Sequence, residues 1–320
     1  MIKSALRIAA LLPLSLVLAG CFNGSNVSDP GPSSSLPQAR KGFVTHLTKK
    51  VKANEDVPAP PAGFKLVYYN APLGSFPAYI TIPKRKPGKH PAIIWISGGF
   101  DNSIGDTPWA PATADNDQSA RAFPAEDIVT MYPSLRGGNH NAGYIEDFLG
   151  EADDVITAEK FLAGRPEVDP HHIYLGGHST GGTLALLVAE STNQFRAVFA
   201  FGPVGYPAAY GNDNLNFDPG NIKEDLVRSP ILYLDTIKSP TYVFEGMQSP
   251  SNISPLHDLA GKSQNSLLHF YQLSDYDHFS ELAPITPVIA SAIKNDTGAL
   301  PNFKFVSIRP SVQPVTENSQ

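Results

Sequence analysis

The chain has 320 residues and a net charge of −6, from 24 Lys and Arg against 30 Asp and Glu. This acidic balance, with no Lys/Arg cluster to offset it, argues against a nucleic-acid partner. The single cysteine, Cys21, excludes an internal disulfide and a thiolate metal site. No set of His, Asp and Glu has metal-ligand spacing, so we expect no metal and no other cofactor.

The first 20 residues are predicted to be a signal peptide outside the fold. A start with two basic residues precedes an apolar run at residues 8–18, which is shorter than the roughly 20 residues of a transmembrane helix. The sequence LAGC at residues 18–21 closely resembles a bacterial lipobox. This resemblance implies a lipid on Cys21, with an ordinary signal peptide as the alternative.

The predicted anchor bears on charge and location. Removing residues 1–20 removes two basic residues and no acidic one, so the net charge goes from −6 to −8. A triacylated cysteine would hold a membrane firmly, whereas a single acyl chain holds it weakly. Phe22 stands where Asp is the familiar inner-membrane retention signal, which favours the periplasmic side of the outer membrane in a bacterial cell envelope. Nothing in the sequence indicates an oligomeric state.

Residues 21–63 are expected to be a lipid-anchored tether and lead-in. Residues 22–40 are rich in Ser, Pro, Gly and Asn, a composition that cannot bury apolar surface, so this part is predicted to be flexible. Residues 41–63 end in PAPPAG, which is stiff. At the other end of the chain, the Pro-containing polar tail over residues 300–320 is expected to be loosely ordered.

Residues 64–299 are predicted to form one α/β domain, because strand-like and helix-like segments alternate along them. The apolar run at residues 90–97 is typical of a parallel strand that is buried on both faces. The alternation predicts a mostly parallel sheet with helices on both faces. The expected strands cover residues 64–70, 78–82, 90–97, 128–133, 172–176, 197–202, 241–245 and 267–273, and the expected helices cover residues 151–163, 180–191, 255–262 and 280–294.

A G-x-S-x-G sequence, GHSTG at residues 177–181, lies between an expected strand and an expected helix. This context places Ser179 on the sharp turn that exposes a nucleophilic serine, and the glycines allow the backbones to approach closely. A serine needs an adjacent base. His278 is the only one of the nine histidines that follows the last expected strand, where the base belongs in the chain order Ser, acid, His.

Four motifs occur in the order of a known family: WISGGF at residues 95–100, LRGG at 135–138, GGHSTGG at 176–182 and DHF at 277–279. Together they resemble the catalytic α/β-hydrolase domain of the prolyl oligopeptidase family. The resemblance covers roughly residues 64–295 and includes no β-propeller. It implies an α/β-hydrolase fold with an insertion before the seventh strand, and it places the family's serine and histidine on Ser179 and His278.

The oxyanion of such a site needs preorganised donors. We expect the Thr180 backbone N–H to be one donor, and the loop of Ser97, Gly98 and Gly99 to supply the other. In the family a tyrosine often precedes the Gly-Gly pair and its hydroxyl helps the oxyanion; here that position is Ser97. Its hydroxyl is short, so a backbone N–H of residues 98–100 is the alternative donor.

The acid that should orient His278 is absent from its usual place. The family pattern after the seventh strand is Gly-x-x-Asp, and Ser249 stands at the Asp position. Glu245, at the end of the expected strand, is the nearest carboxylate, with an exposed surface glutamate as the alternative. Asp277, beside the histidine, is expected to point away from it.

These features predict a serine hydrolase that cleaves a peptide or a carboxylic ester through an acyl-enzyme on Ser179. Its substrate would be a small molecule or a short peptide. The insertion at residues 203–240 is predicted either to cap the site or to form a solvated loop. Two alternatives remain: a catalytically degenerate hydrolase-fold binding lipoprotein, which the missing Asp favours, and an acyltransferase that uses the same residues.

Overall fold

The computed structural model describes residues 35–84, 88–301, 303–305 and 312–315. The predicted signal peptide and Cys21 lie outside these residues, so the lipid anchor stays a prediction. Among the described residues, no helix is long and apolar enough to cross a membrane.

A nine-stranded sheet forms the centre of the described residues. The strands are β1 (Phe64–Ala71), β2 (Gly74–Thr81), β3 (His90–Ile96), β4 (Val129–Pro133), β5 (Val168–His178), β6 (Val198–Phe201), β7 (Thr241–Gln248), β8 (Leu268–Asp277) and β9 (Val312–Pro314). Their spatial order is β1-β2-β4-β3-β5-β6-β7-β8-β9. The neighbours from β4 to β8 pair in parallel, while β1, β2 and β9 pair antiparallel at the edges. The sheet is therefore mostly parallel, as the alternating pattern predicted.

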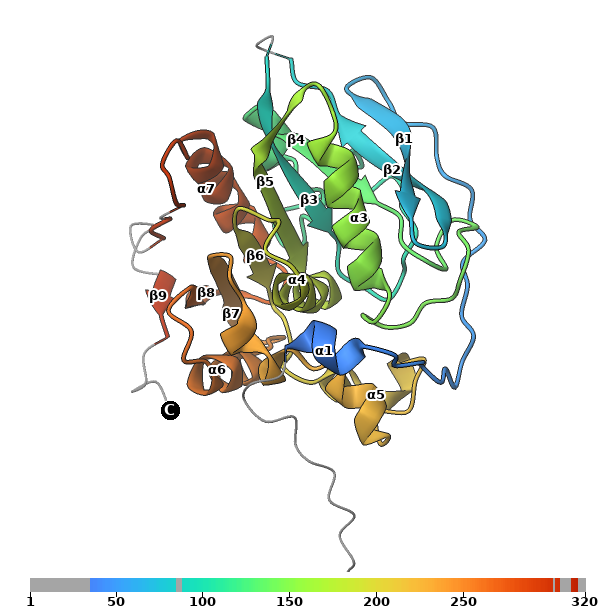
Figure 1. The fold of residues 1–320 in the computed structure, drawn as a ribbon. Coiled ribbons are helices and arrows are strands. Elements are labelled where there is room, and N and C mark those ends of the chain that lie inside the picture. The colour runs from blue at the N-terminus through green and yellow to red at the C-terminus, as the bar shows by residue number, and fades with distance from the viewer. Residues whose placement is uncertain (1–34, 85–87, 302, 306–311, 316–320) are drawn as a thin grey trace, which may run out of the picture. The chain divides into compact units, whose positions relative to one another are not determined.

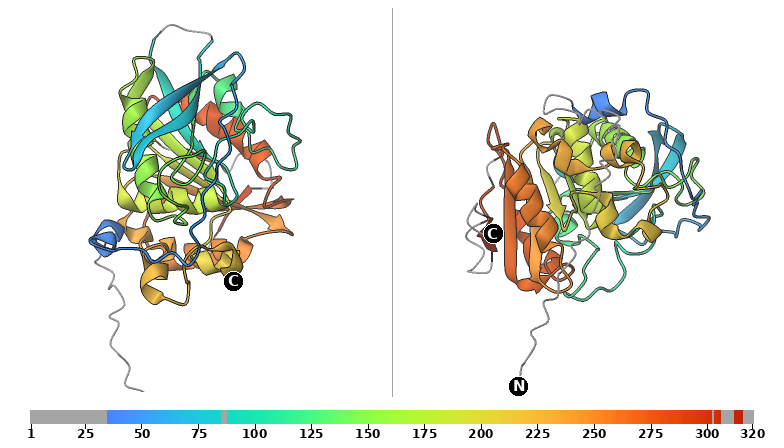
Figure 2. Two further views of the ribbon diagram at one scale, coloured as in Figure 1. Left: turned by 90° about the vertical axis from the view of Figure 1, so that its right-hand side faces the viewer. Right: turned by 90° about the horizontal axis from the view of Figure 1, so that it is seen from below.

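Helices cover both faces of the sheet (Figures 1 and 2). They are α1 (Leu36–Arg40), α2 (Ala122–Ala125), α3 (Glu151–Ala163), α4 (Thr180–Ser191), α5 (Ile222–Leu226), α6 (Ile253–Lys262) and α7 (Leu282–Lys294). Buried side chains of α1, α3, α4 and α6 share one hydrophobic core, and those of α2 and α7 share the other. Within β3, Ile94 and Ile96 enter the first core while Ile93 and Trp95 enter the second. This alternation is the period of two expected of a strand with two buried faces.

The predicted flexible tether is wrong for its last residues, since α1 packs on the domain. Leu36 is 0% exposed within the core that α3 and α4 share. The Arg40 guanidinium donates to the backbone oxygens of Val227 at 2.9 Å, Phe148 at 3.1 Å and Leu149 at 3.2 Å. One apolar side chain and one multivalent donor are enough to hold this short helix, although the surrounding composition is polar.

The tail is also more ordered than predicted. Val312–Pro314 forms β9, which pairs with β8, so β8 is not the edge of the sheet. Phe303 and Phe305 are buried and lie 5.6 Å and 5.2 Å from the Tyr242 ring, measured between ring centroids. These aromatic contacts, together with the edge of β8 that β9 covers, supply the partners that the composition of the tail did not reveal.

Candidate active site

The predicted nucleophile, acid and base all lie at the carboxyl ends of the parallel strands. Ser179 follows β5, Glu245 lies in the second half of β7, and His278 follows β8. Strands β5, β6, β7 and β8 are consecutive neighbours in the sheet. The carboxyl edge of an open α/β sheet is where such folds place their ligand sites.

Ser179 has the backbone strain expected of a nucleophile on a sharp turn. Its φ of 56° and ψ of −116° lie in a region that non-glycine residues rarely adopt. Its N–H donates to the Phe201 oxygen at 2.7 Å, which ties the turn to β6. A Cβ on Gly177 would lie 2.3 Å from the Gly181 oxygen, and one on Gly181 would lie 2.3 Å from the Ile96 oxygen. Both glycines are therefore required by close approach of backbones.

His278 and Glu245 are hydrogen-bonded in the interior. The His278 Nδ1 lies 3.1 Å from Glu245 Oε2, and the two residues are 7% and 0% exposed. The other Glu245 oxygen accepts the Ser251 hydroxyl at 3.4 Å. Asp277 accepts the N–H of Phe279 at 3.0 Å and bonds to Ser280, and thus does not contact the imidazole ring. Of the carboxylates near His278, only Glu245 hydrogen-bonds the ring among the described residues.

Gly202, at the end of β6, makes room for this pair. A Cβ there would lie 2.3 Å from His278 Cε1, 2.6 Å from its Nδ1 and 3.0 Å from Glu245 Oε2. Its φ is +57°, which also favours glycine. The sequence contained this glycine at the end of an expected strand, but only the tertiary structure shows what a side chain would strike.

A second buried glutamate lies near the acid. Glu281 is 0% exposed, and neither of its carboxyl oxygens has a hydrogen-bond partner among the described residues. Burial, together with the negative charges of Glu245 and Asp277, raises the pKa of Glu281 well above its usual 4.5. Burial therefore favours the neutral, protonated form of the Glu281 side chain.

The predicted oxyanion donors lie around Ser179, with one change. Thr180 is the first residue of α4, so its N–H has no acceptor within the helix. Its hydroxyl donates to the Gly99 oxygen at 2.5 Å, which fixes the loop of residues 97–100, here called the oxyanion loop. The Gly98 N–H already donates to Gln118 Oε1 at 3.2 Å. This hydrogen bond withdraws Gly98 from the expected donors and leaves the Ser97 hydroxyl and the backbone N–H groups of residues 99 and 100.

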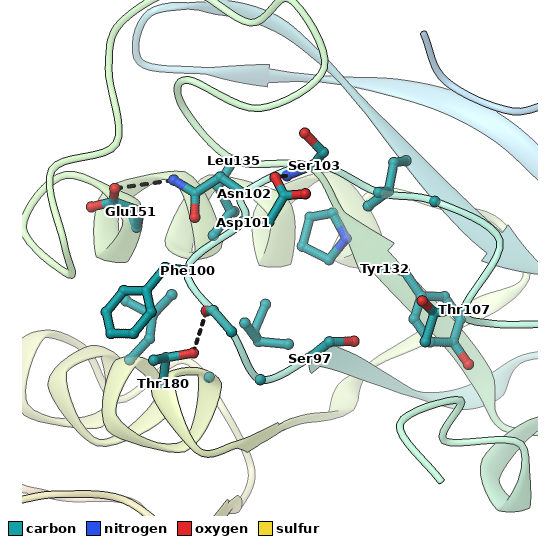
Figure 3. A pocket seen from close by; sticks show the side chains of 18 of the residues that line it. Ser97, Phe100, Asp101, Asn102, Ser103, Thr107, Tyr132, Leu135, Glu151 and Thr180 are labelled. Carbon is teal, nitrogen blue, oxygen red and sulfur yellow. Dashed lines mark hydrogen bonds between the residues drawn. The ribbon is translucent and has the colours of Figure 1, made fainter. Parts of the chain in front are cut away.

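A cavity of about 600 Å³ opens beside Thr180 and the oxyanion loop (Figure 3). Phe100, Tyr132 and Phe148 contribute aromatic walls. No Lys, Arg or His is among the residues that line it, whereas six carboxylate residues are: Glu55, Asp56, Asp101, Asp106, Asp147 and Glu151. The cavity therefore carries a negative potential that disfavours anionic groups.

Glu151 is the most deeply buried of these carboxylates and is 2% exposed. Its Oε1 accepts the Asn102 side-chain amide at 3.1 Å, which Figure 3 shows, and the Glu146 N–H at 2.7 Å. Burial raises the pKa of Glu151 from 4.5 to about 7. Among the residues that the structure describes, no group of three or more His, Cys, Asp or Glu side chains is arranged to hold a metal ion.

Tyr210 is a site residue that the sequence pattern did not single out. It belongs to the 3-10 turn Pro207–Tyr210 in the predicted insertion, and its hydroxyl lies 2.7 Å from Thr183 Oγ1. Burial raises the pKa of the Tyr210 hydroxyl, and the Ser179 side chain lies close enough to offset part of this rise. Its ring contacts Phe100 at a centroid distance of 5.6 Å. The first part of the insertion thus reaches the nucleophile, although nothing in the local sequence distinguishes Tyr210 from the other tyrosines nearby.

The chain is similar to known proteins in part of its sequence and in its fold. Residues 116–264 match the prolyl oligopeptidase family. No curated protein matches the chain. The chain is similar to three solved structures: the 2,6-dihydroxy-pseudo-oxynicotine hydrolase (TM-score 0.58, 15% identity), an acylaminoacyl peptidase of Pyrococcus horikoshii (0.58, 13%) and an esterase of Pyrobaculum calidifontis (0.52, 16%).

The extent of these similarities differs. They cover 75%, 77% and 73% of this chain, and 71%, 43% and 86% of the hydrolase, peptidase and esterase chains respectively. The chain thus spans less than half of the peptidase, which agrees with the predicted resemblance to a catalytic domain alone. At these identities the structural likeness shows the fold, and it confirms the predicted α/β-hydrolase fold. Taken together, the comparisons show an α/β-hydrolase fold in which residues 116–264 match the prolyl oligopeptidase family.

Proposed function

We propose that the protein cleaves a peptide or carboxylic ester bond through an acyl-enzyme on Ser179. The observation that carries this proposal is the strained turn of Ser179 on the same sheet edge as the His278–Glu245 hydrogen bond of 3.1 Å. A protein that only binds a ligand has no need of the strained turn or of a buried carboxylate on the imidazole. The degenerate binding protein is therefore the weaker interpretation, even though the usual Asp is replaced by Ser249.

The hydrogen bond to Glu245 assigns the two imidazole nitrogens of His278. A carboxylate only accepts, so Nδ1 carries the proton and Nε2 is free to take the Ser179 hydroxyl proton. Ser179 Oγ then bonds to the acyl carbon, and the imidazolium that forms is stabilised by the Glu245 charge. When the tetrahedral intermediate collapses, Nε2 returns the proton to the leaving amine or alcohol. Water then attacks the acyl-enzyme and gives a proton to Nε2. The bond between the acyl carbon and Ser179 Oγ breaks, Nε2 returns the proton to Oγ, and the acid is released.

The negative charge of the tetrahedral intermediate falls on an oxygen that needs donors. Thr180 N–H, at the start of α4, supplies one of them, aided by the positive end of the helix. The remaining donor is the Ser97 hydroxyl or a backbone N–H of Gly99 or residue 100, since Gly98 is committed to Gln118. Removing one such donor costs about 10²–10³ in rate in well-studied serine hydrolases, so this loop is central to the proposed reaction.

The cavity beside the oxyanion loop is the proposed binding site for the substrate's side group. Its aromatic walls and negative lining fit a neutral or cationic group and disfavour a carboxylate. The volume of about 600 Å³ fits a small molecule or a short peptide. Whether the scissile bond is an amide or an ester depends on the leaving group, and the proposed residues serve both.

Labelling with a fluorophosphonate tests the proposal without knowledge of the substrate. We expect covalent modification of Ser179, located by peptide mass spectrometry, and its loss in the Ser179→Ala variant. Ser191 lies at the far end of α4 and hydrogen-bonds the Leu187 oxygen, so Ser191→Ala is a matched control that should label normally. Labelling that persists in Ser179→Ala, or a wild-type protein that does not react, would remove the basis of the proposed function.

A further inference from the structure

A chain of hydrogen bonds connects the oxyanion loop to the loop that carries His278. His178, the second residue of GHSTG, is 0% exposed. Its Nδ1 lies 2.7 Å from the Gln118 side-chain nitrogen, and its Nε2 lies 2.7 Å from the His278 backbone oxygen. Gln118 Oε1 in turn accepts the Gly98 N–H at 3.2 Å. Three hydrogen bonds thus run from the loop after β3 to the loop after β8.

Each group in this series of hydrogen bonds can act only as a donor or only as an acceptor. A backbone oxygen only accepts, so Nε2 of His178 carries the hydrogen. The Gln118 oxygen accepts from Gly98, so the Gln118 amide nitrogen faces His178 and donates to an unprotonated Nδ1. Both ends therefore select the same neutral tautomer. Burial and the neighbouring His278 lower the pKa of His178 to about 3, which keeps the ring neutral near pH 7.

Packing leaves this chain little freedom. The rings of His178 and His278 lie 4.6 Å apart between centroids. On the other side, a Cβ on Gly98 would lie 2.9 Å from His178 Nδ1 and 3.1 Å from Ser179 Cβ. His178 therefore fills the space between the oxyanion loop and the catalytic imidazole, next to the nucleophile.

We propose that His178 and Gln118 form a bridge that holds the oxyanion loop and the His278 loop at a fixed separation around Ser179. The bridge rests on the proposed function, since it positions the base relative to the oxyanion donors. His178 does not touch the reacting atoms and is a positioning residue. Because the bridge uses the Gly98 N–H, the second oxyanion donor comes from another group of the oxyanion loop.

Kinetics of matched variants test the bridge. We expect His178→Ala and Gln118→Leu each to lower kcat by about 10²-fold, the effect of a displacement of about 1 Å in an active site, with KM changed less than about threefold. Because both residues act in one series of hydrogen bonds, the double variant should lose no more activity than the more impaired of the two single variants. His172, on the same strand but bonded to Asp169 at 2.8 Å, provides the control: His172→Ala should stay within about twofold of wild type. All activities are taken per folded protein, measured by circular dichroism and gel filtration.

A second measurement does not depend on activity. Nitrogen-15 NMR of labelled histidines at pH 7 should show His178 protonated at Nε2 and not at Nδ1. Gln118→Leu keeps the Nε2 hydrogen bond to the His278 oxygen, so it should leave Nε2 protonated but shift the Nδ1 resonance, which loses its hydrogen bond. If the wild type shows this tautomer but does not react with a fluorophosphonate, the proposed function fails while the bridge stands. The bridge is overturned if Nδ1 carries the hydrogen, if folded Gln118→Leu keeps kcat within twofold, or if the two single losses multiply.

If His178→Ala does not fold, a variant of the half-buried Gln118 tests the bridge instead. In Gln118→Glu the carboxylate can still accept the Gly98 N–H but cannot donate to Nδ1 of a neutral His178. We expect kcat to fall and His178 to gain a proton at Nδ1, visible in the same spectrum. A Gln118→Glu protein with wild-type kcat and an unchanged His178 tautomer would overturn the bridge.

Discussion

Replacing Glu245 by glutamine is the sharpest test of the catalytic assignment, because it removes a charge and keeps the shape. Glu245 is 0% exposed and its Oε2 lies 3.1 Å from His278 Nδ1. Two unit charges at that distance attract by about 5 kcal/mol at an effective dielectric constant of about 20. Since about 1.4 kcal/mol corresponds to a factor of ten in rate, the full loss would be at most about 10⁴-fold.

We expect Glu245→Gln to lower kcat by about 10²–10⁴-fold. The amide oxygen can still accept the Nδ1 hydrogen, but it cannot stabilise the imidazolium that forms as Ser179 attacks. The assay is steady-state hydrolysis of a 4-nitrophenyl ester, with near-ultraviolet circular dichroism as the check on folding. KM should change little, since Glu245 does not line the cavity.

Glu281→Gln is the matched control, because it makes the same substitution at another buried glutamate near the base. Burial favours the neutral form of Glu281, since it raises the pKa well above 4.5. Exchanging it for a neutral amide should therefore change kcat by less than about threefold. The reasoning is refuted if Glu245→Gln retains more than a tenth of the wild-type kcat, or if Glu281→Gln loses as much as Glu245→Gln.

Three further outcomes are expected. Gly202→Ala should lower kcat by about 10²-fold, because relieving a 2.3 Å contact with the catalytic imidazole requires a shift of about 1 Å. Gly42 has a similarly positive φ of +73° but open space around it, so the control Gly42→Ala should lower stability without lowering kcat. As pH rises from 4.5 through about 7, the free energy of unfolding should fall by about 3 kcal/mol more for the wild type than for Glu151→Gln. The reason is that a carboxyl with a raised native pKa stabilises the fold only while it is protonated. Urea titrations measure this, and the two stability curves would stay parallel across the range if Glu151 were ionised throughout. Mature protein from a bacterial membrane fraction should begin at Cys21 and carry lipid, and intact-mass analysis showing an unmodified Cys21 would contradict the proposed anchor.

Local patterns in the sequence determined much of the fold. The two-residue alternation of β3 and the strand–turn–helix context of GHSTG depend on neighbours in the chain, and α3 and α4 span the residues predicted for them. The same patterns selected Ser179 and His278 for their roles, and selected Glu245 as the nearest carboxylate. These patterns could not determine which distant residues come into contact. The Glu245–His278 hydrogen bond, for example, joins residues 33 positions apart in the sequence.

The tertiary structure alone decided which groups those residues contact. The His178–His278 contact spans 100 positions, and the Gln118–His178 contact spans 60. No periodicity within a strand or helix reports on such pairs, because it records only which face a side chain occupies. The same reason explains why Leu36 and β9 were missed, since a short segment of polar composition packs only when a distant surface supplies its partner. The sequence therefore determined the elements and the chemistry they carry, while the packing of the sheet edge decided that Gly98 is bound to Gln118 and that Tyr210 reaches the nucleophile.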